Sequence, residues 1–160
     1  MPVKPAHKPA LTTAEMTAFL EAVFPEVMQG GASMIVEDVG YGTCRIRLKF
    51  RPQQLRPGGT VSGPTMMGLA DFAIYVAVLG ALGKVALAVT TNLNINFMKK
   101  PAPADLIAEC RLLKIGKRLC VGEASMRSDG EDELVAHATA TYSVPPDRGG
   151  AVEGLSPALA

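Results

Sequence analysis

The fold of this chain is organised around residues 62–82, SGPTMMGLADFAIYVAVLGAL, in which Asp71 is the only charged side chain. Ser62 is a good N-cap residue and Pro64 suits the first helical turn, so this stretch predicts a helix that runs to Leu82. Because the helix is apolar on nearly every side, it has no solvent-facing stripe. We therefore expect it to lie inside the protein.

Six segments have the composition of β-strands, two before this helix and four after it. They are residues 33–39, 43–50, 87–98, 105–115, 119–126 and 133–144. Turns of two to five residues join the last four, and turns this short predict antiparallel neighbours. The economical packing wraps an antiparallel sheet around the central helix, which places the chain in the α+β class.

One domain accounts for the length of the chain. Its 160 residues are 48% apolar and 19% charged, which suffices for one core and not for two. Residues 1–11 and 145–160 are rich in Pro, Lys or Gly without a period, so we expect a flexible leader and a flexible tail around a single domain at 12–144. A short amphipathic helix opens this domain, capped by Thr12 or Thr13 and ended by Pro25.

Charge and aromatic content limit the partners. With 16 Lys and Arg against 15 Asp and Glu, the formal net charge is +1, too small to hold the chain to a nucleic acid or an anionic membrane. An aromatic content of 5%, without Trp, leaves few surfaces on which bases could stack. Small molecules or proteins are the partners that these numbers leave.

Cysteine usage and hydropathy predict the compartment. The chain has three cysteines, no CxxC pair and no His at ligand spacing, so we expect neither a disulfide framework nor a bound metal. Pro and Lys interrupt the first residues where a secretory signal needs an apolar run, which predicts a cytoplasmic protein. The longest charge-free apolar run, residues 72–83, is shorter than the roughly 20 residues that cross a membrane.

The start of the central helix offers a backbone N–H at Gly63. Free N–H groups at a helix start bind an anion or a developing oxyanion, and a glycine has no side chain to keep a carbonyl away. Pro64 has no N–H, so Gly63 is the candidate donor. The alternative is an ordinary helix start without a ligand.

Asp71 is a candidate catalytic group because a carboxylate among apolar neighbours costs several kcal/mol unless it is paired or has a task. The alternative is a structural carboxylate, bonded to a backbone end or to an Arg. Eight residues separate it from Gly63, a distance of roughly 12 Å along a helix and too far for both to act on one small group. If both act, a second subunit with an antiparallel helix must bring them together, which predicts a homodimer.

Two further groups of polar residues are weaker candidates. On the strand at 87–98, alternation places Thr91 with Leu93 and Phe97, and Thr90 with the Asn residues, and either Thr could bond Asp71 or orient a water. Cations at 99–100, 114 and 117–118 could meet the phosphates of a coenzyme A, or could be ordinary surface charge. His7 and His137 suggest no Ser-His-Asp constellation.

Two segments, GGTVSGPTMMGLADFAIYVAV and AVTTNLNINFMKKPAPADLIAECRLLKIGKRLCVGEASM, resemble the hotdog-fold acyl-CoA thioesterases of the PaaI (phenylacetic acid degradation) type. The resemblance covers about residues 33 to 144. It rests on a Gly-containing turn that opens the central helix, an acidic residue about two turns later, and the N-x-N-F and K-x-G-K-R patterns that follow. It implies a hotdog fold in dimers or tetramers whose sheets join edge to edge.

Carried over residue by residue, the resemblance implies catalytic roles for three residues: Asp71 as general base or nucleophile, the Gly63 N–H as donor to the thioester carbonyl, and Thr90 beside the water. It departs from the family at the helix start, where Ser62 replaces a His and Pro64 a second Gly, and in the connector, where Arg56 stands in place of an Asn. Residues expected near the substrate are Arg56, Ser62, Pro64, Met67, Thr91, Asn92, Lys117 and Arg118.

The sequence thus predicts a cytoplasmic acyl-CoA thioesterase, a homodimer that can pair into a homotetramer, with no cofactor besides the coenzyme A of its substrate. Met66, Met67, Tyr75 and Phe97 are candidates for the acyl pocket, or plain core residues. The altered helix start leaves open a second hypothesis, a hotdog module that binds acyl-CoA without hydrolysing it. A hydratase, which would need a His near the helix, ranks last.

Overall fold

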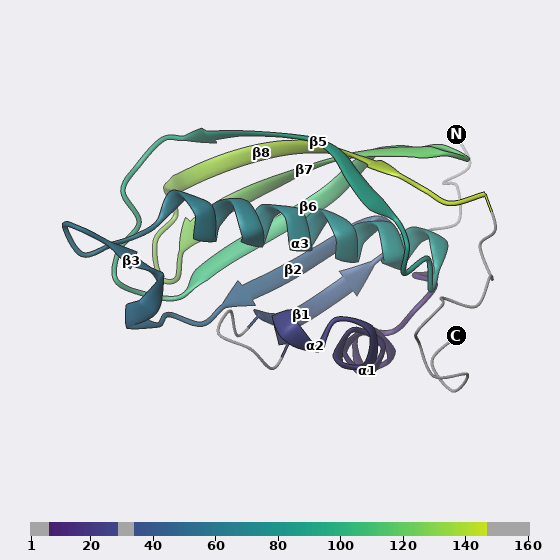
Figure 1. Cartoon of the computed structure of the whole chain (residues 1–160), viewed down its shortest axis with the longest axis horizontal. Helices are drawn as coiled ribbons and strands as arrows, with labels where there is room; N and C mark the ends of the chain where they lie inside the picture. Colours follow the sequence, from purple (N-terminus) through teal and green to yellow (C-terminus); the bar gives the residue numbers. More distant parts are fainter. Residues whose placement is uncertain (1–6, 29–33, 147–160) are drawn as a thin grey trace, which may run out of the picture.

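The computed structural model describes residues 7–28 and 34–146, and its architecture is a curved antiparallel sheet around one long helix (Figure 1). The helix is α3 (Gly63–Leu82), and the strand order of the sheet is β1-β2-β6-β7-β8-β5. The predicted α+β hotdog arrangement is confirmed. The strands are β1 (Met34–Gly40), β2 (Thr43–Leu48), β5 (Val89–Phe97), β6 (Leu106–Ile115), β7 (Leu119–Ser128) and β8 (Leu134–Ser143).

Helix α3 begins and ends as its sequence predicts. The Ser62 side chain accepts from the N–H of Thr65 as N-cap, and Gly83 ends the helix with a φ of 86°, which a glycine adopts without strain. Gly80 allows α3 to approach the end of β1, because a Cβ there would lie 2.7 Å from the carbonyl oxygen of Gly40. Small residues thus set the distance between helix and sheet.

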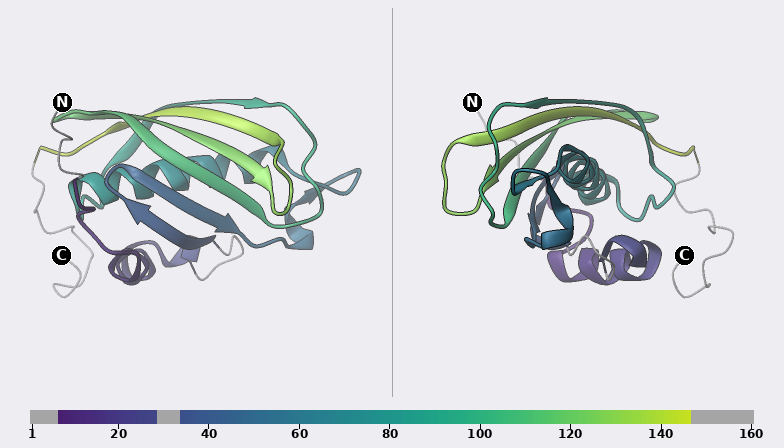
Figure 2. Two further views of the ribbon diagram at one scale, coloured as in Figure 1. Left: turned by 180° about the vertical axis from the view of Figure 1, so that it is seen from behind. Right: turned by 60° about the vertical axis from the view of Figure 1, so that its left-hand side comes forward.

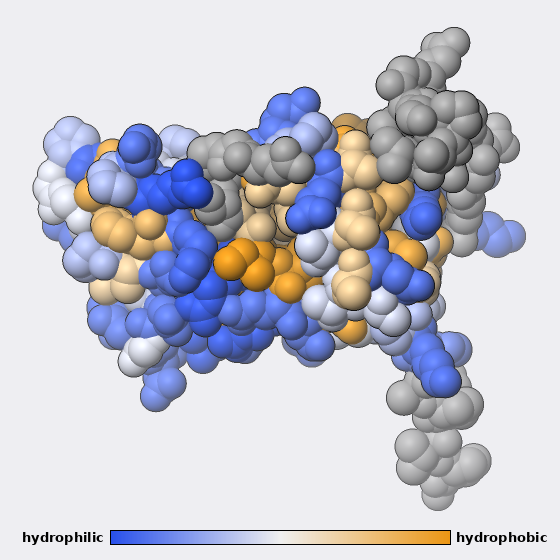
Figure 3. All heavy atoms as spheres, turned by 90° about the horizontal axis from the view of Figure 1, so that it is seen from below, coloured by the Kyte–Doolittle hydropathy of each residue, from blue (hydrophilic) through white to orange (hydrophobic). Residues whose placement is uncertain are grey.

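Two short helices precede the sheet, α1 (Thr13–Val23) and α2 (Pro25–Met28). Thr12 and Glu15 form a capping box at the start of α1, and the helix buries Met16, Phe19 and Leu20. The sheet curves over one side of α3, and α1 lies on the side that the sheet leaves uncovered (Figure 2). Viewed from the side of α1 and α2, the surface shows apolar side chains gathered in the middle of the face (Figure 3).

The pairing of β5 corrects the sequence analysis. The short connection after residue 98 predicted that β5 and β6 are antiparallel neighbours, which is wrong: β5 pairs with β8. The connection passes β8 and β7 before β6 begins, a distance of three strand spacings or about 14 Å. The eight residues 98–105 can span up to about 26 Å, so a connection of this length permits both pairings.

The connector before α3 contains structure that the sequence analysis missed. It forms a 3-10 turn, η1 (Pro52–Gln54), and a short hairpin of β3 (Leu55–Arg56) and β4 (Thr60–Val61). The hairpin was not predicted because the connector is polar and because strands of two residues are too short to show alternation.

The ends of the chain are only partly described. Residues 1–6 and 147–160, in the predicted flexible leader and tail, lie outside the described residues. Near the end of the leader, the N–H of Ala10 donates to the carbonyl oxygen of Gly80, and Leu11 is buried. The packed part of the chain therefore begins before residue 12.

By length and hydropathy, α3 could span a membrane. Most of α3 is buried against the sheet and α1, so its apolar composition is that of a core helix.

Candidate active site

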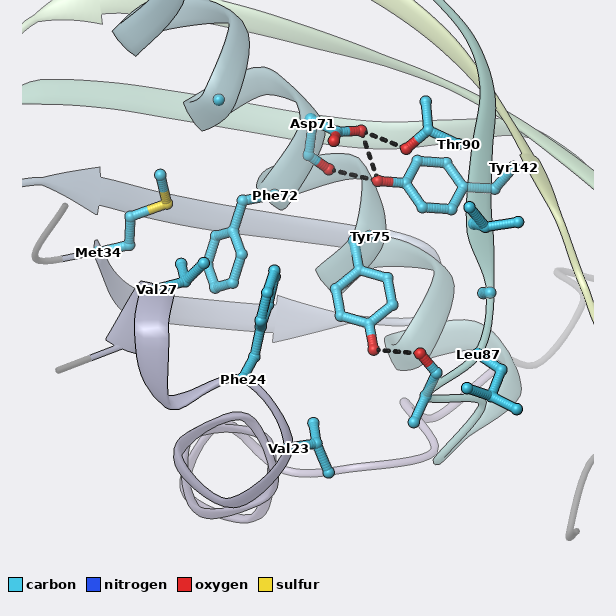
Figure 4. Close-up of a pocket in the computed structure, with 14 residues that line it drawn as sticks. Val23, Phe24, Val27, Met34, Asp71, Phe72, Tyr75, Leu87, Thr90 and Tyr142 are labelled. Atoms are coloured by element: carbon cyan, nitrogen blue, oxygen red, sulfur yellow. Dashed lines mark hydrogen bonds between the residues drawn. The ribbon is translucent and has the colours of Figure 1, made fainter. Parts of the chain in front are cut away.

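A cavity of about 600 Å³ lies beside the middle of α3 (Figure 4). Residues of α1, α2 and the start of β1 form one wall, α3 forms the second, and the start of β5 with the segment before it and β8 forms the third. Among the described residues, Asp71 is the only charged one in the lining, which includes Val23, Phe24, Val27, Met34, Gly68, Asp71, Phe72, Tyr75, Ala86, Leu87, Ala88, Val89, Thr90 and Tyr142. The cavity is therefore an apolar pocket with one carboxylate.

Two hydroxyl groups hold the carboxylate of Asp71. Thr90 Oγ1 and the Tyr142 hydroxyl each donate to Asp71 Oδ1 at 2.6 Å, and the Tyr142 hydroxyl also lies 2.8 Å from the backbone carbonyl oxygen of Asp71. No hydrogen bond joins Asp71 Oδ2 to another of the described residues. One oxygen is thus engaged by the protein and the other is available to a ligand.

A bulge in β5 brings Thr90 to Asp71. Thr90 pairs with Tyr142 of β8, and Asn92 pairs with the next residue, Thr141, so the register shifts between Thr90 and Asn92. The shift places Thr90 on the helix-facing side with Leu93, whereas uninterrupted alternation grouped Thr90 with the Asn residues. Thr91 is exposed, and its hydroxyl donates to the carbonyl oxygen of Thr141.

Aromatic rings line the rest of the cavity. The chain has five Phe and three Tyr, and two of each line this cavity. The Phe24 ring lies edge-on to Tyr75, with ring centroids 6.3 Å apart, and Tyr75 stacks on Tyr142 at 6.1 Å. The Tyr75 hydroxyl donates to the carbonyl oxygen of Ala86, and burial raises the pKa of Tyr75 to about 12. Tyr75 therefore offers its ring, not its hydroxyl, to a ligand.

Gly63 lies in a second cleft of about 460 Å³ at the start of α3, which Asp71 does not line. Arg56, Met66, Phe97 and residues 98–101 also line it. Because a Cβ on Gly63 would lie 3.4 Å from Cζ of Phe97, this side chain closes over the glycine. Within one chain, the structure keeps Gly63 and Asp71 in separate cavities.

The first half of α3 corrects the expectation of a helix buried on every side. Pro64, Met67 and Gly68 are exposed, and Asp71 is partly exposed. These four residues recur at helical spacing and form one stripe, which we name the α3 stripe. The stripe is open because the sheet and α1 cover only the other sides of α3.

The remaining predicted substrate residues lie away from the carboxylate. Met67 lines neither cavity, and Asn92 is exposed on β5. Lys117 and Arg118 lie in the turn between β6 and β7 and do not line the Asp71 cavity. Of the acyl-pocket candidates, only Tyr75 lines that cavity, whereas Met66 and Phe97 line the cleft of Gly63.

Tyr142 and Phe24 line the cavity but were not among the predicted site residues. On β8, Tyr142 follows the small inward-facing residues Ala138 and Ala140. A single large side chain at the end of this inward-facing series was the sequence feature that could have indicated its role. Its contact with Asp71 depends on the pairing of β8 with β5. Phe24 directly follows α1 and continues the amphipathic pattern of that helix. Nothing in the sequence around it indicated that it lines a pocket.

Comparisons with known proteins identify the family of this chain. A sequence model of the thioesterase superfamily matches residues 58–141, slightly more than half of the chain. A protein of Saccharolobus solfataricus, named as a candidate esterase, is 34% identical over 108 residues, which cover 68% of this chain and 71% of the relative.

Solved structures give the same result. A candidate thioesterase from Silicibacter sp. TM1040 is 43% identical, with a TM-score of 0.79, covering 89% of this chain and 97% of that chain. A candidate thioesterase from Ralstonia eutropha JMP134, described as related to phenylacetic acid degradation, is 26% identical, with a TM-score of 0.69, covering 79% and 98%. The predicted resemblance is confirmed, and the chain belongs to the thioesterase superfamily.

Proposed function

We propose that this protein hydrolyses an acyl-CoA thioester to a free acid and coenzyme A, with Asp71 as the reacting carboxylate. The observation that carries the proposal is a carboxylate that is fixed through one oxygen at the edge of an apolar cavity of about 600 Å³. An apolar cavity receives an acyl group, and a carboxylate beside it can meet the thioester carbon.

Asp71 can act in two ways, and the geometry supports both. As general base, Oδ2 takes a proton from water while the oxygen of that water attacks the carbonyl carbon. As nucleophile, Oδ2 attacks that carbon and forms an anhydride, which water then hydrolyses. In both cases the thiolate of coenzyme A leaves and takes up a proton.

The Gly63 N–H would stabilise the oxyanion from a second subunit. The first N–H groups of α3 have no partner within the helix, and those of an antiparallel partner helix would reach toward Asp71. The α3 stripe includes Asp71, and β5, whose Thr90 bonds Asp71, is at the end of the sheet. A homodimer that covers both would complete the site, and such dimers can pair into a homotetramer.

The coenzyme A moiety would lie outside the apolar cavity. Arg56, Ser62 and Pro64 surround the helix start that the proposal places near the thioester. Lys117 and Arg118 carry the positive charge that the phosphates of coenzyme A require. Thr91, Asn92 and Met67 lie on the faces that a second subunit would bring to the substrate.

Release of thiol from acyl-CoA tests this function. We expect the full chain to release coenzyme A from short, medium, long or aromatic acyl-CoAs, with a preference within the panel. Asp71→Asn is expected to lower kcat/KM by about 10²- to 10⁴-fold, the usual contribution of a general base. Asp38→Asn is the control, because Asp38 is an exposed carboxylate on β1 outside both cavities. Equal turnover by wild type and Asp71→Asn would contradict the assignment.

One observation favours a second candidate, an acyl-CoA-binding protein without turnover. The helix start has no His, and the hydroxyl groups of Ser62 and Thr65 bond each other at 2.8 Å. Neither hydroxyl is then fully available to position a thioester. Saturable acyl-CoA binding in titration calorimetry, with no thiol release from any member of the panel, would favour this candidate.

A further inference from the structure

The residue that the proposed reaction leaves without a role is Tyr142, whose side chain is 3% exposed. Its hydroxyl contacts the reacting residue twice, at the carboxylate oxygen Oδ1 and at the backbone carbonyl oxygen (Figure 4). An ionised carboxylate is a stronger acceptor than a carbonyl, so the shared proton favours the side chain. Tyr142 therefore joins the last strand of the sheet to the middle of α3.

The surroundings of Tyr142 keep its hydroxyl protonated and in place. Burial, together with the hydrogen bond to Asp71, raises the pKa of Tyr142 far above its ordinary value. The hydroxyl is then a donor throughout the pH range in which the protein would act. Stacking on Tyr75, at 6.1 Å between ring centroids, fixes the ring.

Two donors on one oxygen restrict the carboxylate. Thr90 and Tyr142 approach Oδ1 from neighbouring strands, β5 and β8, at the same distance of 2.6 Å. A carboxylate with one donor can rotate about its Cβ–Cγ bond, whereas two donors from different strands define its plane. They also stabilise charge on Oδ1, which leaves Oδ2 as the oxygen without a partner among the described residues.

We propose that Tyr142 is a positioning residue for Asp71, which holds Oδ1 so that Oδ2 alone meets the water or the thioester carbon. This inference rests on the proposed function, since it assigns a role within that reaction. It differs from a purely structural role, in which the ring of Tyr142 fills the core and its hydroxyl only satisfies a buried acceptor. Removing the hydroxyl while keeping the ring separates the two roles.

The test compares Tyr142→Phe with two other hydroxyl deletions on the best acyl-CoA substrate. Tyr142→Phe is expected to lower kcat by about ten-fold or more, the usual effect of losing one hydrogen bond to a charged group, with KM changed less than two-fold. Tyr75→Phe removes a hydroxyl in the same cavity that bonds Ala86 instead of Asp71, and is expected to lower thermal stability and to reduce kcat less than Tyr142→Phe does. Tyr41→Phe, in the turn between β1 and β2 outside both cavities, is expected to match wild type.

Thr90→Val supplies a second measurement in case Tyr142→Phe does not fold. It removes the other donor to Oδ1, so its kcat should fall in the same way, and the double variant should lose less than the product of the two single losses. Circular dichroism melting curves show which variants are folded.

The outcomes separate the two proposals. If the wild type releases thiol and the folded Tyr142→Phe variant has the same kcat, this inference is overturned and the proposed function remains intact. If Tyr142→Phe does not fold, wild-type kcat in Thr90→Val would overturn it. Absence of thiol release by wild type would overturn the proposed function and the inference together.

Discussion

Asp71 is bonded by neutral hydroxyl groups and has no ion-pair partner among the described residues. A structural carboxylate buried in a core is ordinarily neutralised by an Arg or a Lys, because an unpaired buried charge is costly. Asp71 avoids most of this cost by lying on the open α3 stripe. Its negative charge is therefore oriented without being neutralised, which favours a role in chemistry over one in stability.

The Gly63 N–H can be tested by a substitution that removes the donor, compared with one that only adds a side chain. Gly63→Pro deletes the N–H at a first-turn position where Pro is tolerated, and should lower kcat by about 10²- to 10³-fold if this group binds the oxyanion. Gly63→Ala keeps the N–H, and its Cβ would lie 3.4 Å from the Phe97 ring, an ordinary contact. Thiol-release kinetics should show a much smaller loss for Ala than for Pro. Equal losses would mean that the space at Gly63 matters and its N–H does not.

At the scale of elements, α1 and α2 supply a wall of the cavity although the family match begins at residue 58, after both helices. Val23, Phe24 and Val27 come from this segment, and Asp71 comes from α3 within the matched region. The proposed reacting carboxylate and one wall of the proposed acyl-binding cavity are thus encoded in different parts of the chain. Acyl selectivity can then change through α1 and α2 without changing the chemistry.

Phe24 is the residue through which α1 and α2 should select the acyl group. Its ring contacts Tyr75 and Phe72 across the cavity, so Phe24→Ala enlarges the cavity away from Asp71. We expect the preferred acyl chain to lengthen, with kcat on that chain within a few-fold of the wild-type value. Tyr41→Ala is the matched control, since both rings are 38% exposed and Tyr41 lies outside the cavity. An unchanged chain-length profile across the acyl-CoA panel would contradict this role.

At the scale of the whole molecule, the open α3 stripe lies beside an unpaired sheet edge. Strand β5 is at the end of the sheet, and its nine residues carry no charge. A long edge without charged residues offers free N–H and C=O groups to another strand. Val89 and Phe97 on β5 and Met67 on α3 are also exposed. These features fit a second copy of the chain and support the proposed homodimer.

Mixed dimers test whether the site is shared between subunits. Asp71→Asn and Gly63→Pro protomers are each expected to be inactive alone. Co-refolding them in equal amounts should restore about one quarter of the wild-type activity, because half of the dimers are mixed and each has one intact site. If both groups act within one chain, no activity returns. Sedimentation velocity on the same samples establishes that mixed dimers have formed.

The outer face of the sheet predicts a loss of stability in acid. Burial acts to raise the pKa of Glu37, but bonds from Arg45 and Arg47 outweigh it and hold the pKa below its ordinary 4.5. Burial also acts to raise the pKa of Asp105. Hydrogen bonds from the Phe50 N–H, Lys49 and Arg47 outweigh this effect and hold the pKa below its ordinary 3.8.

Because these pKa values are lower in the folded protein than in the unfolded chain, the stabilisation is present above the unfolded values and lost as the pH falls through the folded ones. Urea unfolding should therefore show a falling free energy of unfolding below about pH 4.5. Glu37→Gln should be less stable than wild type at pH 7 and should lose less on acidification. Parallel pH profiles for the two proteins would contradict this account.

Local patterns in the sequence determined much of the fold and part of the site. The length, apolar composition and cap of α3 are properties of consecutive residues, as is the composition that marks the six strands of the sheet. Asp71 was identifiable because a single charge in an apolar helix is costly unless the group is paired or has a function. The spacing of Gly63 and Asp71 on one helix is fixed by helical geometry, and the prediction of a shared site followed from it.

Only the tertiary structure decided which elements meet. The pairing of β5 with β8 joins segments far apart in the chain, and the connection after residue 98 is long enough for either pairing. The bulge that turns Thr90 toward Asp71 is a shift of one residue, which the alternation of side chains does not reveal. Tyr142 and Phe24 reach the cavity through contacts of the same kind. Such contacts depend on strand register and on packing between distant segments, whereas the sequence reports only on neighbours along the chain.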